Sequence, residues 1–221
     1  MSNLLLYYRP KGQKHDPQRF SGFVTKSEFL RRGEFIHKRI ARGFSAEEVS
    51  FLIGRNKLFI EDYEEMSGGI RPDGEDIQAL SELLGEDLSI LFPPQGDDLL
   101  DWEVSGTKKE KDSTLFYQAA LETDETGKLE IKAEETIWEE YENVPVRDHG
   151  AAFDIVTELL EGNYFLSSRS ALEIFTTIQG VLAFKMRPVA LKWEISHFLL
   201  SRKLCCYRNS NGKWRYHKRI N

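Results

Sequence analysis

Basic and aromatic side chains gather near the end of this chain, and together they have the chemistry of a phosphate-binding surface. Residues 163–221 carry 11 basic and 2 acidic side chains, with Tyr207, Trp214 and Tyr216 among them. Lysine and arginine neutralise the phosphates of nucleic acids and release the counterions held there. The cations that we expect to hold phosphate are Arg187, Lys192, Arg202, Lys203, Arg208, Lys213 and Arg215.

A second polar group lies earlier in the chain, where Arg55, Asn56 and Lys57 precede a predicted helix. Side chains of these types at the start of a helix can donate to base edges and phosphates. Glu61 and Asp62 follow within the same helix, and their carboxylates would repel phosphate. This segment therefore contains both side chains that attract phosphate and side chains that repel it.

Catalytic chemistry has little support in the residue types. The five histidines match no metal-ligand spacing, and the sequence contains no phosphate-cradling glycine loop and no nucleophile-elbow serine. We therefore expect no enzyme activity, no cofactor and no metal site.

Helical periodicity runs through residues 27–93 and predicts five short helices that would position the earlier polar group. Ser45, followed three residues later by Glu48, is a capping box and predicts that a helix begins there. Gly54 is of the residue type that ends helices. The proline- and glycine-containing residues 93–96 predict the end of this domain.

The helical domain resembles the helix-turn-helix domain of the lambda-repressor and Cro family (Xre-like) over about residues 34–93. The resemblance is carried by Ser45, Glu48, Gly54, Ile60, Glu64, Pro72, Leu80, Leu84, Gly85, Leu88, Leu91 and Phe92. It implies that Arg55, Asn56 and Lys57 enter a DNA groove, and that homodimers bind two half-sites. At positions that are commonly polar in this family the chain has Phe51, Leu52 and Leu58, which would instead suit a protein-contact surface.

Residues 149–221 are similar to a winged-helix domain, because three predicted helices precede an Asn211-Gly212 hairpin signal. The resemblance implies that the third helix and the hairpin hold DNA through the cations named first. An alternative is that these cations dock on the acidic residues 97–148, which carry 6 basic and 16 acidic side chains. That arrangement would make the protein mask its own basic surface.

The remaining segments complete the predicted organisation. Residues 1–26 suggest a basic, flexible arm, and residues 94–148 suggest either an acidic linker or a β-hairpin that turns at 124–127. The expected fold class is mainly α with a small β component: a five-helix helix-turn-helix bundle plus a winged-helix-like C-terminal domain.

The function that we expect is a DNA-binding transcriptional regulator that contacts double-stranded DNA. The alternative is a protein-interaction module, an antitoxin-like or immunity-like factor whose helix-turn-helix is degenerate and whose partner is a protein. The longest apolar runs are too short to cross a membrane, and cysteine is limited to Cys205 and Cys206. Both observations favour a cytoplasmic protein without a membrane partner.

Overall fold

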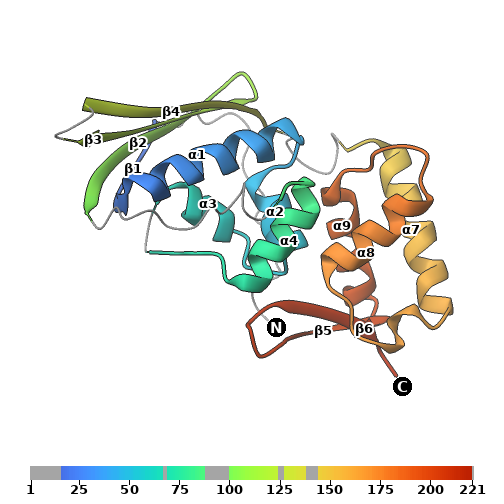
Figure 1. Cartoon of the computed structure of the whole chain (residues 1–221). Coiled ribbons are helices and arrows are strands. Elements are labelled where there is room, and N and C mark those ends of the chain that lie inside the picture. Colours follow the sequence, from blue (N-terminus) through green and yellow to red (C-terminus); the bar gives the residue numbers. More distant parts are fainter. Residues whose placement is uncertain (1–15, 67–68, 88–99, 124–126, 138–143, 221) are drawn as a thin grey trace.

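The computed structural model describes residues 16–66, 69–87, 100–123, 127–137 and 144–220. Within these ranges the chain forms seven α-helices, one 3-10 helix and six strands (Figure 1). In chain order they are β1 (Gln18–Thr25), α1 (Lys26–Ala41), α2 (Ala46–Leu52), α3 (Phe59–Glu64), α4 (Gly74–Leu84), β2 (Asp101–Lys111), β3 (Thr114–Thr123), β4 (Gly127–Thr136), α7 (Val146–Glu161), η1 (Tyr164–Leu166), α8 (Ala171–Val181), α9 (Pro188–Leu200), β5 (Leu204–Arg208) and β6 (Trp214–Lys218).

Strands β1 to β4 form one antiparallel sheet in that order, and α1 lies across one of its faces (Figure 1). Alternate strand residues turn toward the helix, and Val104, Tyr117 and Ile131 are buried there with Phe29 and Ile36 of α1. One packed face and one solvated face are usual for an antiparallel sheet. The sheet and α1 therefore build an apolar core of their own.

The expected fold class, mainly α with a small β component, is wrong. Helices hold 46% and strands 27% of the residues that the structure describes. The prediction of a flexible arm over residues 1–26 fails for residues 18–25, which form β1 and pair with β2. The linker alternative for residues 94–148 is also wrong, because residues 101–136 supply the other three strands of the sheet.

The strands were hard to predict because their inward-facing residues are not uniformly apolar. In β2, Lys108 faces the interior at the same alternation as Val104, so its charge interrupts the apolar pattern. In β1 and β2, Gly22 and Gly106 occupy inward positions. The ring of Phe20 lies over Gly106, where an added Cβ would come within 2.0 Å of it, and stacks on Tyr117. These contacts fill the space that glycine leaves.

Helices α1 to α4 form the N-terminal bundle, and the elements from α7 to β6 form the C-terminal module. The two share one apolar cluster, in which Val49, Ile60 and Leu80 of the bundle are grouped with Ile174 and Leu191 of the module. Figure 1 shows the C-terminal module beside α2 and α4, on the side away from the sheet. Because a continuous core joins them, the two parts form a single packed unit.

Several predicted features fall outside the described residues. These are the arm over residues 1–15, Leu88, Leu91 and Phe92 of the expected fifth helix, the boundary at residues 93–96, and residues 124–126 of the turn. No helix in the part of the chain that the structure describes has the length and apolar character needed to cross a membrane.

Candidate functional site

The turn between α2 and α3 is held by local interactions that the sequence indicates. Ser45 and Glu48 form the predicted capping box, which confirms that α2 begins there. Gly54 ends the helix with φ +75. The hydroxyl of Ser50 donates to Ala46 O and accepts from Ile60 N at 3.0 Å, so it ties the start of α3 to α2. The pair of helices is thus fixed as a rigid unit.

The C-terminal hairpin, residues 204–218, covers this turn. Trp214 N donates to Gly54 O at 2.9 Å. The guanidinium of Arg55 donates to Asn211 O at 3.1 Å, and Arg208 Nη2 donates to Asn56 Oδ1 at 2.6 Å. Three consecutive residues of the turn are therefore bonded to the hairpin.

Two buried or half-buried cations meet three carboxylates where α4 begins. Arg55 Nη2 lies 2.7 Å from Asp76 and also contacts Asp73. From the hairpin, Lys213 Nζ lies 3.1 Å from both Glu75 and Asp76 and 3.2 Å from Asp73. Asp76 is fully buried, and the Lys213 side chain is only 7% exposed. The cluster therefore joins the bundle to the hairpin, and its buried pair, Lys213 and Asp76, is screened little by water.

These contacts shift the protonation equilibria of the cluster in favour of the charged forms. The hydrogen bond to Asp76 outweighs burial and raises the pKa of Arg55. Burial alone would raise the pKa of Asp73. The Asp76 N–H and the Lys213 ammonium outweigh it and hold that pKa below its ordinary value. Both groups are therefore charged near neutral pH.

A second charged contact joins the start of α9 to the start of α2. Arg187 Nη2 lies 2.6 Å from Glu48, and Lys192 contacts Glu47, which also lies 3.1 Å from Lys57. Burial would raise the pKa of Glu47, but Lys192 and Lys57 outweigh it and lower that pKa. The first turn of α2 is thus covered by cations of the C-terminal module.

The acids of α3, Glu61 and Asp62, lie on the side of the helix near the sheet. Lys108 Nζ of β2 lies 3.3 Å from Glu61 and 2.8 Å from Glu65. Burial and the neighbouring charge of Glu61 raise the pKa of Asp62. Tyr117 Oη donates to Glu64 O at 2.7 Å, which fixes the same helix to β3. Glu61, one of the two acids that would repel phosphate, is therefore paired with a cation of the sheet.

The predicted DNA-binding residues divide into two groups. Arg55, Asn56, Lys57, Arg187, Lys192, Arg208, Lys213 and Arg215 each contact another side chain or carbonyl of the chain, and Arg215 lies 2.7 Å from Glu173. Arg202 and Lys203 are exposed beyond the end of α9. Most of the expected phosphate-binding cations are thus engaged inside the protein.

The predicted protein-contact surface of Phe51, Leu52 and Leu58 is corrected in one position. Leu52 is fully buried in the core, so its assignment to a surface is wrong. Phe51 is half-buried against that core, and Leu58 is 51% exposed. Leu52 faces inward because α2 is packed on both the bundle and the C-terminal module.

The residues that sequence reasoning missed are the acids that receive the cations. The alternative of docking on residues 97–148 is wrong about the acceptor: within the described residues, the bundle supplies it through Glu47, Glu48, Asp73, Glu75 and Asp76. The sequence contains a local signal for two of these acids, because Asp73 and Asp76 have the spacing of a capping box and form one at the start of α4. Their second role, which is to bind Lys213, depends on the hairpin, and the hairpin lies about 140 residues further along the chain.

Comparisons with protein-family models, curated proteins and solved structures found no match for this chain. The resemblances to helix-turn-helix and winged-helix domains therefore stay predictions. Among the described residues, no group of three or more histidine, cysteine or acidic side chains is placed to hold a metal ion.

Proposed function

We propose that this chain is a protein-interaction module, in which the N-terminal bundle is a protein-binding platform rather than a DNA reader. The observation that carries the proposal is the position of the C-terminal module on the bundle. A DNA-reading helix-turn-helix uses the first helix to cross the backbone and the start of the second to reach base edges. Here α9 covers the start of α2, and the hairpin covers the residues that lead into α3.

The charges on this side of the bundle also suit a protein better than DNA. Its acids Glu47, Glu48, Asp73, Glu75 and Asp76 attract cations and would repel phosphates. In addition, the contact includes an apolar part, since Phe44 of the bundle meets Phe175 of α8 edge to face. Exposing these groups to a DNA duplex would require opening the shared core, which hydrophobic burial opposes.

A titration of duplex DNA followed by fluorescence anisotropy tests this proposal on the full chain. At about 50 mM salt we expect no binding that depends on Lys57, the exposed cation nearest to α3. Lys57→Glu should therefore behave like the wild type and like the control Arg71→Glu, which changes an exposed cation elsewhere on the bundle. Salt-sensitive binding that is lost in Lys57→Glu and kept in Arg71→Glu would contradict the proposal and show that α3 contacts DNA.

A transcriptional regulator that binds double-stranded DNA is the second candidate, and one observation favours it. Arg202, Lys203 and Arg219 are exposed at the base of the hairpin, and Tyr207, further along β5, is 43% exposed. Among the described residues, none of these three cations takes part in an ion pair with an acid. Such a group can neutralise phosphates without any opening of the core.

The same titration distinguishes the second candidate. If the base of the hairpin holds DNA, Arg202→Glu with Lys203→Glu should remove binding. Each lost phosphate contact should reduce the slope of the logarithm of the binding constant against the logarithm of the salt concentration by about one. Lys57→Glu should leave that binding unchanged. No binding at low salt by the wild type would remove this candidate and leave the protein-interaction function.

A further inference from the structure

Strand β1 lies at one edge of the four-stranded sheet, so one side of its backbone has no neighbouring strand in that sheet. Two hydrogen bonds near β4 show which backbone groups of the sheet point outward. Lys132 O accepts a bond from His37 Nε2 at 2.9 Å, so the backbone groups of Lys132 point away from β3. Ile137 N donates to Ser113 O at 2.8 Å, so the residues that alternate with Lys132 are those that bond to β3.

The register of the sheet carries this alternation across to β1. Lys132 is paired with Gln118 of β3, whose backbone groups must therefore bond to β2. Gln118 is paired with Thr107 of β2, which is also paired with Arg19 and must leave that residue unbonded. Within the described ranges, no backbone group outside the sheet bonds to β1. The N–H and C=O groups that point to the open edge thus belong to Arg19, Ser21 and Phe23.

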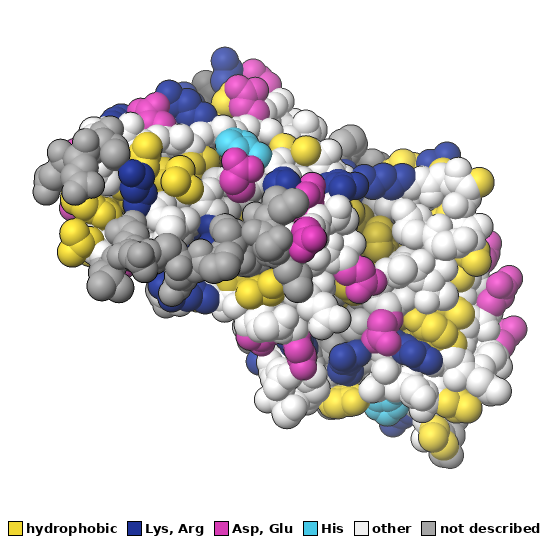
Figure 2. Space-filling view, in the orientation of Figure 1, with side chains coloured by type: hydrophobic (Ala, Val, Ile, Leu, Met, Phe, Trp, Pro, Cys, Tyr) yellow, Lys and Arg dark blue, Asp and Glu magenta, His cyan; other side chains and the backbone are white. Residues whose placement is uncertain are grey.

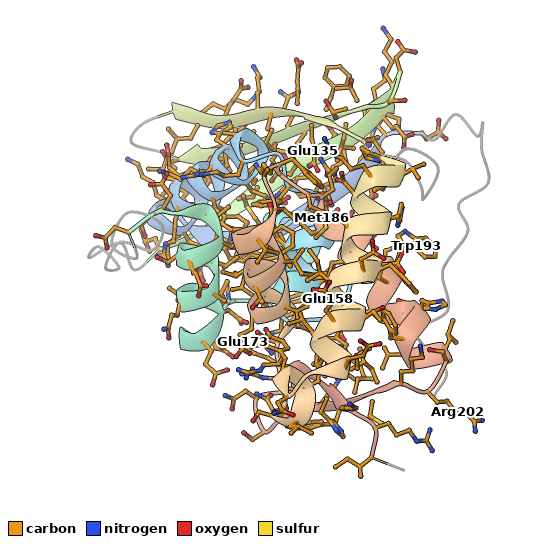
Figure 3. The ribbon with its side chains drawn as sticks, turned by 90° about the vertical axis from the view of Figure 1, so that its right-hand side faces the viewer. Glu135, Glu158, Glu173, Met186, Trp193 and Arg202 are labelled. Carbon is orange, nitrogen blue, oxygen red and sulfur yellow. The ribbon has the colours of Figure 1, made fainter. Side chains whose placement is uncertain are left out.

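This edge lacks the charged side chains with which proteins usually protect an open strand. At the opposite edge, the side chains of β4 on the outer face are all charged: Lys128, Glu130, Lys132 and Glu134. Figure 2 shows acidic and basic side chains along the upper edge of the molecule, where β4 lies in Figure 1. On β1 the corresponding positions hold one charge, Arg19, and Phe23 is 70% exposed. Figure 3 shows the outer face of the sheet at the top, with no helix above it. The edge of β1 is therefore open to another strand.

The open stretch is bounded at both ends, and its centre is Ser21. Pro17 has no N–H at one end, and Thr25 caps α1 at the other. We propose that β1 pairs antiparallel with β1 of a second copy, so that the two sheets become continuous across a two-fold axis at Ser21. This axis pairs Ser21 with itself, and Arg19 of each copy with Phe23 of the other. Two backbone hydrogen bonds for each of these three pairs give about six in all.

The side chains on the outer face match when the strand pairs with itself, which an isologous interface requires. Arg19 of one copy lies beside the ring of Phe23 of the other, where a cation and an aromatic face attract each other. Within its own sheet Phe23 is paired with Glu103, an exposed acid. Two strand spacings, about 10 Å, separate the Cα of this acid from that of the incoming arginine, so the two side chains can meet.

The other charges along this edge also avoid repulsion. They are Asp16, which is exposed, and Lys26 at the start of α1. The axis at Ser21 brings Asp16 of each copy to the end of the strand where Lys26 of the other copy lies. No like charges then lie directly opposite each other. This charge complementarity favours a second copy over a strand of another protein.

The edge of β1 is separate from the contact between the bundle and the C-terminal module. Figure 1 shows β1 on the side of the N-terminal bundle away from that module. The dimer proposal therefore does not rest on the proposed function, and either can fail alone. One pair of short strands buries less than the roughly 1,200 Å² of a stable interface, so we expect a dimer that dissociates on dilution.

Sedimentation equilibrium of the full chain over about 10 μM to 1 mM protein tests the proposal. The wild type should change from monomer to dimer within this range. Ser21→Pro removes the central N–H, which the sheet itself does not use, so this variant should keep the fold and stay monomeric. Glu130→Pro is the matched control, because its N–H points to the open edge of β4, and it should dimerise like the wild type. Thermal unfolding verifies that both proline variants are folded.

Substitutions on the outer face provide a second test that does not depend on proline. Arg19→Glu and Glu103→Arg should each weaken the dimer about fivefold or more, and their combination in one chain should restore it. Phe23→Ser should weaken it about tenfold. The control Phe116→Ser changes a phenylalanine that is 37% exposed on the same face but belongs to β3, and it should have no effect.

Two results would overturn the proposal. One is a wild type that stays monomeric over the whole concentration range, which would leave the edge of β1 to a strand of another protein. The other is a dimer that persists in Ser21→Pro and is indifferent to both charge reversals and to Phe23→Ser. If Ser21→Pro does not fold, the charge and phenylalanine variants decide the question alone.

Discussion

The backbone N–H of Trp214 donates to the carbonyl of Gly54 at 2.9 Å, and this bond joins the hairpin to the turn between α2 and α3. The approach is close enough that a Cβ on Gly54 would lie 3.2 Å from both Trp214 N and Trp214 O. Main-chain atoms on both sides cannot move aside independently. The glycine at this turn therefore allows the backbone of the hairpin to lie directly against it.

Gly54→Ala should destabilise the protein more than Gly43→Ala does. Both glycines have positive φ, +75 and +78, so each alanine would cost about 1 to 2 kcal/mol through backbone strain alone. Only Gly54 also faces Trp214, whereas nothing lies within 4 Å of a Cβ at Gly43. We expect an additional loss of about 1 kcal/mol or more at Gly54, measured by urea unfolding. Equal losses would mean that the hairpin yields to the new methyl group.

Lys213→Met should lower the stability by about 1 to 3 kcal/mol, because it leaves the buried Asp76 and its two neighbours with one cation instead of two. The methionine keeps most of the apolar volume, so the loss reports mainly on charge. Arg202→Met is the matched control, since Arg202 is exposed and close in sequence. Thermal unfolding of both variants measures the difference. An unchanged midpoint for Lys213→Met would show that the acids are satisfied without it.

Acid should weaken the same contact. The pKa of Asp73 is lower in the folded protein than its ordinary value of 3.8, so the unfolded chain takes up the proton first as the pH falls. The stabilisation from this group is complete above about pH 4 and is lost as the pH falls toward the folded pKa. Asp73→Asn should reduce the pH dependence of stability in that window while keeping a good helix cap. Unfolding by urea between about pH 3 and 6 measures it, and an identical slope in the variant would contradict the assignment.

Local signals in the sequence predict local structure well in this chain. The Ser45 and Glu48 capping box starts α2, and the Asn211-Gly212 signal falls in the loop between β5 and β6. Both depend on residues a few positions apart. The sequence likewise shows that the C-terminal segment is basic and aromatic, which is the chemistry of its contacts.

What the sequence could not show is which groups meet across long separations. Lys108 looks like a surface residue of an acidic segment until Glu65, more than 40 residues earlier, is seen 2.8 Å away. Lys213 looks like a phosphate ligand until Asp76 is placed beside it. The residues around a cation in the sequence are the same whether its partner is a phosphate or a carboxylate. Only the tertiary contact therefore distinguishes a cation that binds DNA from one that docks on another part of the chain.

Arg39 and Glu64 should behave as a coupled pair that joins α1, α3 and the sheet. Arg39 donates to both oxygens of Glu64 at 2.6 and 2.9 Å and also to Glu135 of β4 at 2.9 Å. Only 2% of the Arg39 side chain and 3% of the Glu64 side chain are exposed. Arg39→Met leaves the Glu64 carboxylate buried without this cation, and we expect a loss of about 3 to 5 kcal/mol in the free energy of unfolding.

The double variant Arg39→Met with Glu64→Gln separates the cost of the unpaired charge from the value of the pair itself. Replacing both charged groups removes the buried, uncompensated carboxylate, so the double variant should lose less than the sum of the two single losses. Urea unfolding of the wild type, both single variants and the double variant completes the cycle. Additive losses would mean that the two residues act separately. In that case the placement of α3 against the sheet would depend on Tyr117 and Lys108, which bind Glu64 and Glu61 of this helix, rather than on this pair.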